Sequence, residues 1–344
     1  METGNHYRLF VGVDSAAETF TATWSQRDGT PIKPRTFTQT PEGYRQFMTA
    51  LQAAHQAVGQ TLVVLEATSS YWIARAVALH EAQFVVSVVN PAHVHHCAKS
   101  LPRRSKTDPL DAHVLRQFAV ERQPAAWTPP PDVYHELRQR LVTRDALLEM
   151  RQQARNHHHA LIQWPVQIAS VKDQLEAVIA DLDARIGVLE YEIQAVLNQS
   201  AWAQSAVLLQ SINSIGPLTS AWVLVLTLNF EACPTPKAAV AYAGLAPMLR
   251  ESGKRIRGRP EIGHGGNKRL RTALYLATLN AVRFNPVIRV FYDRLVAAGK
   301  PAKVARCAAA RKLLQIAWGV VHSGERFDPQ YEERRRSDVK VHPA

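Results

Sequence analysis

The sequence has few cysteines and no long hydrophobic run. Its 344 residues include three Cys, at positions 97, 233 and 307. They lie far apart and form no CxxC pair, which excludes a zinc knuckle and a disulfide framework. No apolar run approaches the roughly 20 residues that cross a bilayer, and residues 1–10 lack the charged-then-apolar order of a signal peptide. These absences predict a soluble intracellular protein without a membrane partner.

Acidic residues are also scarce. The chain has 29 Asp and Glu against 41 Lys and Arg, a formal net charge of +12. A surplus of cations this large indicates polyanionic partners such as nucleic acids. Hydrophobic residues make up 46% of the chain, which excludes wholesale disorder. The length, at roughly 150 residues per domain, predicts two or three domains.

The first 123 residues alternate strand-like and helix-like segments. Residues 8–14 form a short apolar run and residues 19–24 alternate β-branched with other residues, so we expect a hairpin. Strands interleaved with helices predict an α/β domain with a mixed sheet. The other predicted strands span residues 61–66 and 84–89, and the predicted helices span residues 41–56, 71–81 and 108–120.

A proline-rich linker at residues 124–131 leads into long helices that extend to residue 200. Trp164 and Pro165 mark the bend between two helical arms. Apolar residues of the second arm recur with the spacing of a coiled coil. Two interpretations stay open, a pair of helices within one chain and an arm through which two copies dimerise. The apolar stripe consists of Leu175, Ile179, Leu182, Ile186, Leu189, Ile193 and Val196.

The rest of the chain predicts a third domain and a tail. Residues 201–328 are mostly helical in pattern, with a Gly- and Arg-rich interruption from Glu251 to Arg271. Residues 329–344 carry three consecutive Arg, at positions 334 to 336, and we expect this basic tail to be disordered.

Four acidic residues stand out by position. Asp14 and Glu66 each end a predicted strand, where open α/β sheets bind their ligands. Asp108 and Asp111 share one face at the start of a predicted helix. Clustered carboxylates repel one another unless cations bind them, and their hard oxygens suit two Mg²⁺ ions about 4 Å apart in phosphodiester cleavage. Together the four acids indicate an RNase H-like or RuvC-like arrangement.

Each acid also has a structural interpretation. Asp14 is explained as a turn residue, and Asp108 before Pro109 as a helix N-cap. Glu66 is harder to explain in this way, because a carboxylate that closes a buried apolar strand is costly unless it is paired or coordinates a cation. Taken singly the structural interpretations are favoured, and taken together the acids favour a catalytic site.

Ser252 lies in a run of cations and glycines between Arg250 and Pro260. Such a loop can approach a phosphate closely, so Ser252 is a candidate nucleophile, although a Ser-Gly pair in a basic loop is far more often a simple turn. Cations also stand at the start of the helix that follows, where they oppose its dipole and therefore indicate an anionic ligand. The candidate nucleic-acid ligands are Arg103, Arg104, Lys106, Lys254, Arg255, Arg257, Arg259, Lys268, Arg269 and Arg271.

With these residues assembled, the sequence resembles the DEDD transposases of the insertion-sequence 110 type, which include the Piv invertases. The N-terminal half carries the resemblance in Val11-Gly-Val-Asp14, Leu65-Glu66-Ala-Thr-Ser-Ser-Tyr71, Val89-Asn-Pro91 and Lys106-Thr-Asp108-Pro-Leu-Asp111-Ala112. The C-terminal half carries it in Ser214-Ile-Gly216, Ala243-Gly-Leu-Ala-Pro247, Glu251-Ser252-Gly253 and Gly266-Asn-Lys-Arg-Leu-Arg271. Several motifs in the same order make the match specific over nearly the whole chain.

The resemblance implies a fold and a set of site residues. It implies a RuvC-like (RNase H-like) mixed-sheet domain at 1–123, a linker and helical coiled-coil arm at 124–200, and a mostly helical transposase domain at 201–328. Asp14, Glu66, Asp108 and Asp111 are then the Mg²⁺-binding catalytic acids, with two ions expected. Ser252 is then the nucleophile that forms a phosphoserine link to DNA.

The resemblance also implies partners and a location. The expected partners are donor and target DNA, a structured bridge RNA, and a second copy of the chain in a homodimer that assembles to a tetramer. The expected location is the bacterial cytoplasm, at the nucleoid. Ala17 stands where many relatives have Lys, and Ser69 and Ser70 stand where others have Gly and Thr, but neither departure removes a carboxylate or the serine.

Three other functions remain open. One is a RuvC-like Holliday-junction endonuclease that uses water as the nucleophile, and the long C-terminal half argues against it. Another is a Piv-type invertase that uses no guide RNA. The third is a structural nucleic-acid-binding protein derived from a transposase, and the intact acids and serine argue against it.

Overall fold

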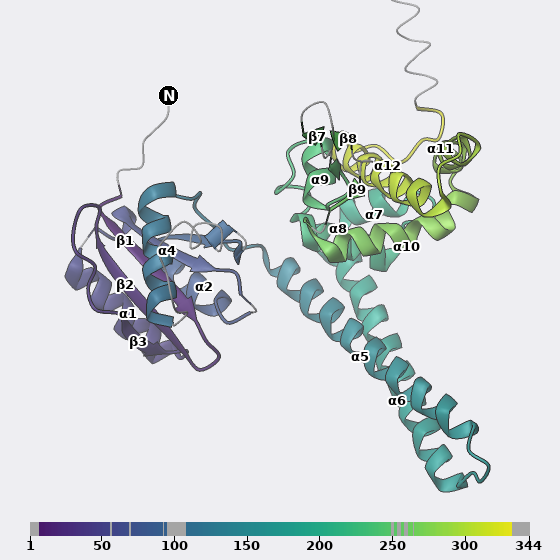
Figure 1. Ribbon diagram of the computed structural model, residues 1–344, viewed down its shortest axis with the longest axis horizontal. Coiled ribbons are helices and arrows are strands. Elements are labelled where there is room, and N and C mark those ends of the chain that lie inside the picture. Colours follow the sequence, from purple (N-terminus) through teal and green to yellow (C-terminus); the bar gives the residue numbers. More distant parts are fainter. Residues whose placement is uncertain are drawn as a thin grey trace, which may run out of the picture. The chain divides into compact units, whose positions relative to one another are not determined.

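The chain forms two compact units, Met1–Pro129 and Pro130–Ala344, which are described separately (Figure 1). The computed structural model describes residues 7–55, 57–68, 70–91, 93–94, 108–248, 251–252, 256–257, 261–263 and 265–331. Among these residues, no helix combines the length and the apolar character that crossing a bilayer requires.

The first unit is built on a five-stranded mixed sheet in the order β3-β2-β1-β4-β5. β1 pairs antiparallel with β2 and parallel with β4, and β4 pairs parallel with β5. The predicted mixed α/β sheet is therefore confirmed, while β3 is an edge strand that the sequence did not predict. The strands are β1 (Leu9–Ser15), β2 (Thr19–Gln26), β3 (Arg35–Thr38), β4 (Thr61–Glu66) and β5 (Val85–Val89). The helices are α1 (Pro41–Ala54), α2 (Ile73–Glu81) and α4 (Asp108–Arg122), with a 3-10 turn η1 at Val58–Gln60.

Helices cover both faces of this sheet. Because side chains alternate along a strand, Val11 and Val13 pack on one face with residues of α1 and α2, such as Phe47 and Leu79. Phe10 lies on the opposite face, against apolar residues of α4. Both faces of the sheet are thus buried, which explains why the sequences of β1, β4 and β5 are nearly continuous apolar runs.

The second unit begins with an antiparallel pair of long helices, α5 (Asp132–Ile162) and α6 (Ala169–Gln199). The two helices contact each other along their length, from an ion pair of Arg140 with Glu192 near the base to a hydrogen bond of His158 with Glu176 near the tip. The predicted stripe on α6 is buried or half-buried along its length. The interpretation as a pair of helices within one chain is confirmed, and dimerisation through the arm stays a prediction.

The remaining helices form a mostly helical body at the base of the arm. Its core includes Leu209, Leu224 and Leu313 together with Leu141 and Ile193 of the arm, so arm and body share one core. The helices are α7 (Ala203–Gln210), α8 (Pro217–Thr227), α9 (Pro236–Tyr242), α10 (Lys268–Phe284), α11 (Pro286–Ala297) and α12 (Ala302–Ser323). Four short strands lie between α9 and α10 in the described part of the chain: β6 (Pro247–Met248), β7 (Glu251–Ser252), β8 (Ile256–Arg257) and β9 (Glu261–Ile262).

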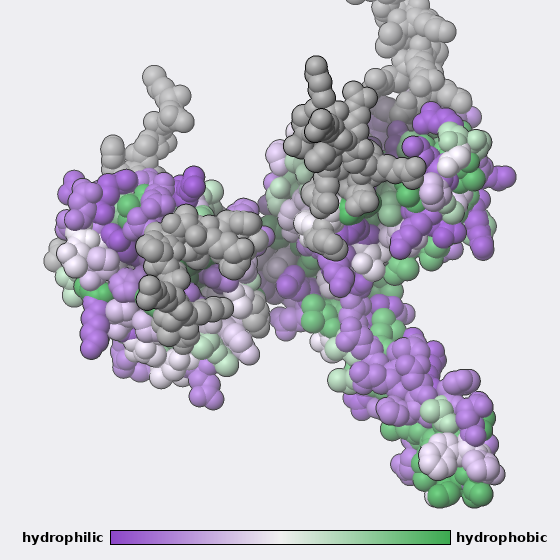
Figure 2. Space-filling view, in the orientation of Figure 1, coloured by the Kyte–Doolittle hydropathy of each residue, from purple (hydrophilic) through white to green (hydrophobic). Residues whose placement is uncertain are grey.

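The tip of the arm presents apolar side chains to solvent. Trp164, Val166 and Ile168, in the turn between α5 and α6, are 66%, 76% and 63% exposed, and Figure 2 shows green apolar surface at the far end of the arm. An exposed apolar patch of this kind commonly marks an interaction site.

Candidate functional site

Asp14 and Glu66 lie side by side at the carboxyl edge of the sheet. The parallel register of β1 and β4 ends with Val13 opposite Leu65, so each acid is the next residue on its strand. Adjacent strands lie about 4.8 Å apart, and residues in register point to the same face. Both acids are half-buried. Glu66 also accepts a hydrogen bond of 2.8 Å from the Thr68 hydroxyl.

Helix α4 lies directly on β1 beside these acids. A Cβ added to Gly12 would come within 3.0 Å of backbone atoms of Ala112, Leu115 and Arg116. The Arg116 guanidinium also donates a hydrogen bond to the Ser25 hydroxyl on β2. Ser25 pairs with Phe10, near the start of β1. The contact with Gly12 thus brings Ala112, the residue after Asp111, beside the strand position two residues before Asp14.

The donor set at this edge suits a hard cation, because it consists of carboxylates at the ends of two neighbouring strands and at the start of α4. In the part of the chain that the structure describes, no three His, Cys, Asp or Glu side chains are close enough to hold a metal ion. The side chain of Asp108 lies outside the described residues. The four-carboxylate magnesium site therefore stays a prediction.

A buried arginine supports the end of β1 from the opposite face. Arg75 has no exposed surface, and its guanidinium lies 4.3 Å from the centroid of the Phe20 ring. It donates to the Ser15 hydroxyl at 2.5 Å and to Gln39 Oε1 at 3.1 Å. Burial lowers the pKa of Arg75 to about 10, a shift that the charges of Tyr44 and Asp14 oppose. Arg75 is thus a positive charge within electrostatic reach of Asp14.

Gln39 extends this support to the chain that follows Glu66. Its amide nitrogen donates to the carbonyl of Ala16 at 3.1 Å and to that of Tyr71 at 3.2 Å. The Tyr44 hydroxyl in turn donates to Gln39 Oε1 at 3.1 Å. The chain after β1 and the chain after β4 are therefore tied to each other.

Ser252 lies in a hairpin of two short nested ladders in the second unit. The outer ladder pairs Pro247 with Ile262, and the inner ladder pairs Ser252 with Ile256. The backbone of Ser252 is therefore the end of β7, paired with β8; both strands are labelled in Figure 1, and the side chain of Ser252 is not among the described ones. The predicted ligands Arg103, Arg104, Lys106, Lys254, Arg255 and Arg259, and the side chain of Arg257, also lie outside the described residues.

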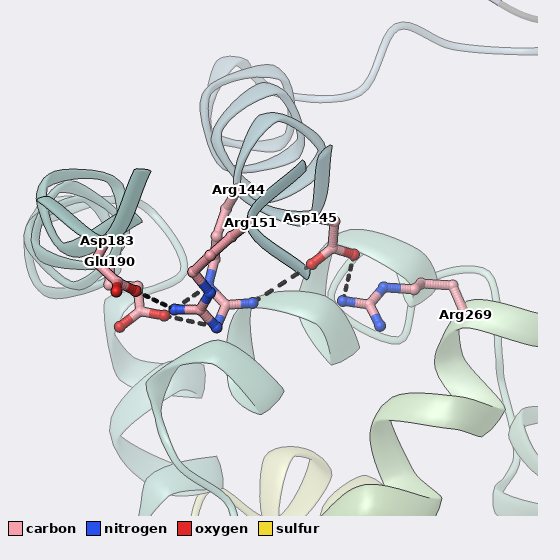
Figure 3. A network of polar contacts seen from close by, with 6 residues as sticks. All are labelled: Arg144, Asp145, Arg151, Asp183, Glu190 and Arg269. Carbon is pink, nitrogen blue, oxygen red and sulfur yellow. Dashed lines mark hydrogen bonds and ion pairs between the residues drawn. The ribbon is translucent and has the colours of Figure 1, made fainter. Parts of the chain in front are cut away.

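Arg269 has partners within the protein. Its guanidinium lies 4.2 Å from the Trp222 ring centroid and 2.5 Å from a carboxylate oxygen of Asp145 on α5. Asp145 also contacts Arg144, whose guanidinium lies 2.6 Å from Glu190 (Figure 3). Burial lowers the pKa of Arg269 and raises that of Asp145, and the attraction between the two opposes both shifts. Arg269 thus connects the arm to the first turn of α10.

Asp145→Asn is expected to destabilise the protein by about 1–2 kcal/mol, because it leaves the half-buried guanidinium of Arg269 without a counter-charge. The matched control is Asp181→Asn on α6, whose ion pair with Arg185 is well exposed and should contribute nothing measurable. Urea denaturation followed by circular dichroism compares the two variants. Equal stability losses would show that the Asp145–Arg269 pair does not join arm and body.

The other two ligands predicted on α10 differ from each other. Lys268 is exposed, whereas Arg271 donates to three backbone carbonyls, those of Ala243, Gly244 and Gly265. These acceptors could not be predicted from the sequence, because they lie in loops that approach α10 only in the fold. Arg75 and Gly12 were also missed. A Gly in the middle of an apolar strand is a signal of close backbone approach that could have identified Gly12.

Two sequence families match the chain in the regions that carry these residues. A family described as "Transposase", of the DEDD type of IS110, matches residues 11–164, which include the four acids. The "Transposase IS116/IS110/IS902 family" matches residues 206–293, which include Ser252.

Three relatives extend the match. The "Pilin gene-inverting protein" of Moraxella lacunata is 30% identical over 332 residues, 95% of this chain and 99% of that protein. The protein of the same name from Moraxella bovis gives the same values. The "Insertion element IS110 uncharacterized 43.6 kDa protein" of Streptomyces coelicolor is 32% identical over 153 residues, 44% of this chain and 36% of that protein. This chain therefore belongs to the IS116/IS110/IS902 transposase family and is a DNA transposase or recombinase.

Proposed function

We propose that the protein is the transposase of an insertion sequence, which exchanges DNA strands at specific sites through a phosphoserine at Ser252, assisted by Mg²⁺ at Asp14, Glu66, Asp108 and Asp111. The observation that carries the proposal is the register of β1 and β4, which sets Asp14 and Glu66 beside each other, on a strand pair whose β1 packs against α4 at Gly12. Asp14 and Glu66, which were predicted from separate segments of the chain, thus follow neighbouring strands at the same edge of the sheet. For Ser252 the support is its backbone position at the end of β7, within the region that the second family matches.

The chemistry consists of two transesterifications. In the first, Ser252 Oγ attacks a DNA phosphorus atom and the bond from phosphorus to the 3′ oxygen breaks. The serine hydroxyl loses its proton as the new ester bond forms, and the departing 3′ oxygen gains a proton. In the second, a 3′ hydroxyl of the partner strand attacks the phosphoserine, and Ser252 recovers its proton. Mg²⁺ bound by the four acids would stabilise negative charge on the attacking and leaving oxygens. Each phosphodiester is replaced by another ester, so the exchange needs no external energy source.

The choice of DNA site has two candidate explanations. A structured bridge RNA that pairs with donor and target DNA fits the net charge of +12, which suits an RNA as well as a DNA partner. The names of the Moraxella relatives favour a second candidate function, site-specific inversion of a DNA segment, which we propose as the alternative that uses no guide RNA. Sequencing of the RNA that co-purifies with the protein from its host separates them. One discrete RNA encoded beside the gene supports the guide, and heterogeneous RNA supports the inversion.

The proposed assembly is a homodimer that pairs into a tetramer, so that both strands of two DNA partners are cut together. The apolar tip of the arm, with Trp164, Val166 and Ile168, supports contact between copies. A hydrolytic RuvC-like Holliday-junction endonuclease is the remaining alternative. It requires no serine and forms no covalent link to DNA, so one variant decides between the mechanisms.

Ser252→Ala is expected to abolish the covalent protein–DNA adduct and strand exchange, because no other group replaces the attacking oxygen. The measurement uses the purified protein, the RNA that co-purifies with it, Mg²⁺ and a labelled duplex that contains the junction of the element with its flanking DNA. Adducts are resolved on a denaturing gel. The matched control is Ser205→Ala on α7, which should form the adduct at the wild-type rate.

Two results would contradict the mechanism. Strand exchange by Ser252→Ala would remove the serine from it. Junction cleavage by the wild-type protein without any adduct would favour the hydrolytic endonuclease. Binding of the labelled duplex by Ser252→Ala, measured by fluorescence anisotropy, should match the wild type and thereby shows that the variant is folded.

A further inference from the structure

The segment that contains Ser252 leaves the helical body and returns to it at one point. Before the segment, Gly244 follows α9 with a φ of +67°, and after it Gly266 precedes α10 with a φ of +81°. A Cβ on Gly266 would come within 3.0 Å of backbone atoms of Gly244 and Tyr242. The backbone amide of Asn267 donates to the carbonyl of Tyr242 at 2.7 Å. The two ends of the segment are thus held in backbone contact, a junction that we call the neck.

Arg271 fastens this neck from α10. One terminal nitrogen, Nη1, donates to the carbonyl of Gly265 at 2.9 Å and to the carbonyls of Ala243 and Gly244 at 3.3 and 3.4 Å. The first acceptor follows the serine segment and the other two precede it, so a single guanidinium bridges both ends. Bonds from a charged donor are roughly twice as strong as those between neutral groups.

The base from which Arg271 acts is itself well fixed. Asn267 caps α10 by accepting from the backbone amide of Leu270 at 3.0 Å, and its side-chain nitrogen contacts the Tyr242 hydroxyl at 3.4 Å. Leu270 is fully buried, and Arg269 is anchored to Asp145 and Trp222. The first turn of α10 is therefore a rigid support from which Arg271 extends to the neck.

We propose that Arg271 is a positioning residue for the nucleophile: it closes the neck of the segment that carries Ser252 and so fixes where the hydroxyl stands. This inference rests on the proposed role of Ser252. Its rival is the role that the sequence first predicted, a cation that binds DNA or RNA phosphate. The two roles differ in what they control, since a phosphate ligand sets affinity and its salt dependence, whereas a positioning residue sets the rate of attack after the DNA is bound.

The test compares Arg271→Gln with the wild type in two measurements on the same labelled duplex. We expect adduct formation at saturating DNA to slow by about 100-fold, the loss that a displacement of about 1 Å causes in a well-oriented reaction. We expect the DNA affinity and its slope against salt concentration to stay unchanged. Hydrogen exchange of the DNA-free protein should rise at the amides of Leu245 and Asn267, which border the neck.

Three other variants calibrate the measurement. Lys268→Gln removes an exposed cation from the same turn of α10 and is expected to lower DNA affinity and reduce the salt slope. Arg289→Gln on α11, where Arg289 is well exposed near Asp293, should leave rate, affinity and slope unchanged. Arg271→Lys retains the charge and loses the planar fork, so it should form the adduct at a rate between those of Arg271→Gln and the wild type, with the wild-type salt slope.

The proposal is overturned if Arg271→Gln forms the adduct at the wild-type rate, or if it loses affinity and salt slope as Lys268→Gln does. If Arg271→Gln does not fold, Arg271→Lys decides: a slower adduct at unchanged salt slope supports positioning, and a wild-type rate overturns it. Failure of the serine mechanism gives a separate result, because the wild type would then form no adduct while hydrogen exchange still reports whether Arg271 closes the neck.

Discussion

Asp14→Asn is expected to slow DNA cleavage on the order of 1,000-fold at saturating Mg²⁺, because the amide removes a negative ligand from the place where charge must be balanced in the transition state. Asp14 is singled out among the acids by its surroundings. It lies next to Glu66 across a parallel ladder, follows the Gly12 contact with α4 by two residues, and lies within reach of the charge of Arg75. The matched control is Asp28→Asn, an exposed carboxylate in the turn after β2, which should cleave at the wild-type rate.

Metal binding by Asp14 can be measured without any reaction. A ligand that binds only the native state raises the melting temperature, so Mg²⁺ should raise that of the wild type and of Asp28→Asn but not that of Asp14→Asn. Cleavage by the wild type in the presence of EDTA would contradict the role of the metal. A normal Mg²⁺-induced rise in Asp14→Asn would show that Asp14 is not a ligand.

Much of the first unit could be predicted from the sequence because local patterns determine it. The apolar runs that became β1, β4 and β5 are buried on both faces, so their composition alone identifies them. β3 was missed because only Phe37 of its four residues is buried, and such a short edge strand leaves no alternating pattern. The strands around Ser252 have two residues each and leave none either.

The partners of the basic residues could not be predicted, because they are far away in the sequence. The rule that cations oppose the dipole at a helix start predicted an anionic ligand for Arg269 and Arg271 rather than a role in fold stability. It could not show that the acceptors are Asp145 on α5 and the carbonyls of the neck. The acids, by contrast, were predictable, since the end of a strand and the start of a helix can be identified locally.

Gly12→Ala is expected to destabilise the first unit by about 3 kcal/mol or more, the upper part of the range for overpacking. The added methyl group would come within 3.0 Å of the α4 backbone at Ala112, Leu115 and Arg116, and neither a strand in the middle of a sheet nor a helix backbone can yield locally. α4 must therefore move as a whole away from β1, which opens its packing against Phe10. Thermal unfolding followed by circular dichroism should show the loss.

The same substitution at Gly187 separates this steric effect from the general effect of Gly→Ala. Gly187 lies in the middle of α6 with open space around its Cα, and Ala is about 1 kcal/mol more favourable than Gly inside a helix, so Gly187→Ala should stabilise the protein. Because α4 carries Asp108 and Asp111, Gly12→Ala should also lose Mg²⁺-dependent cleavage at temperatures where the variant is still folded. A Gly12→Ala protein as stable and as active as the wild type would show that α4 does not lie on β1, and the convergence of acids on that edge would lose its structural basis.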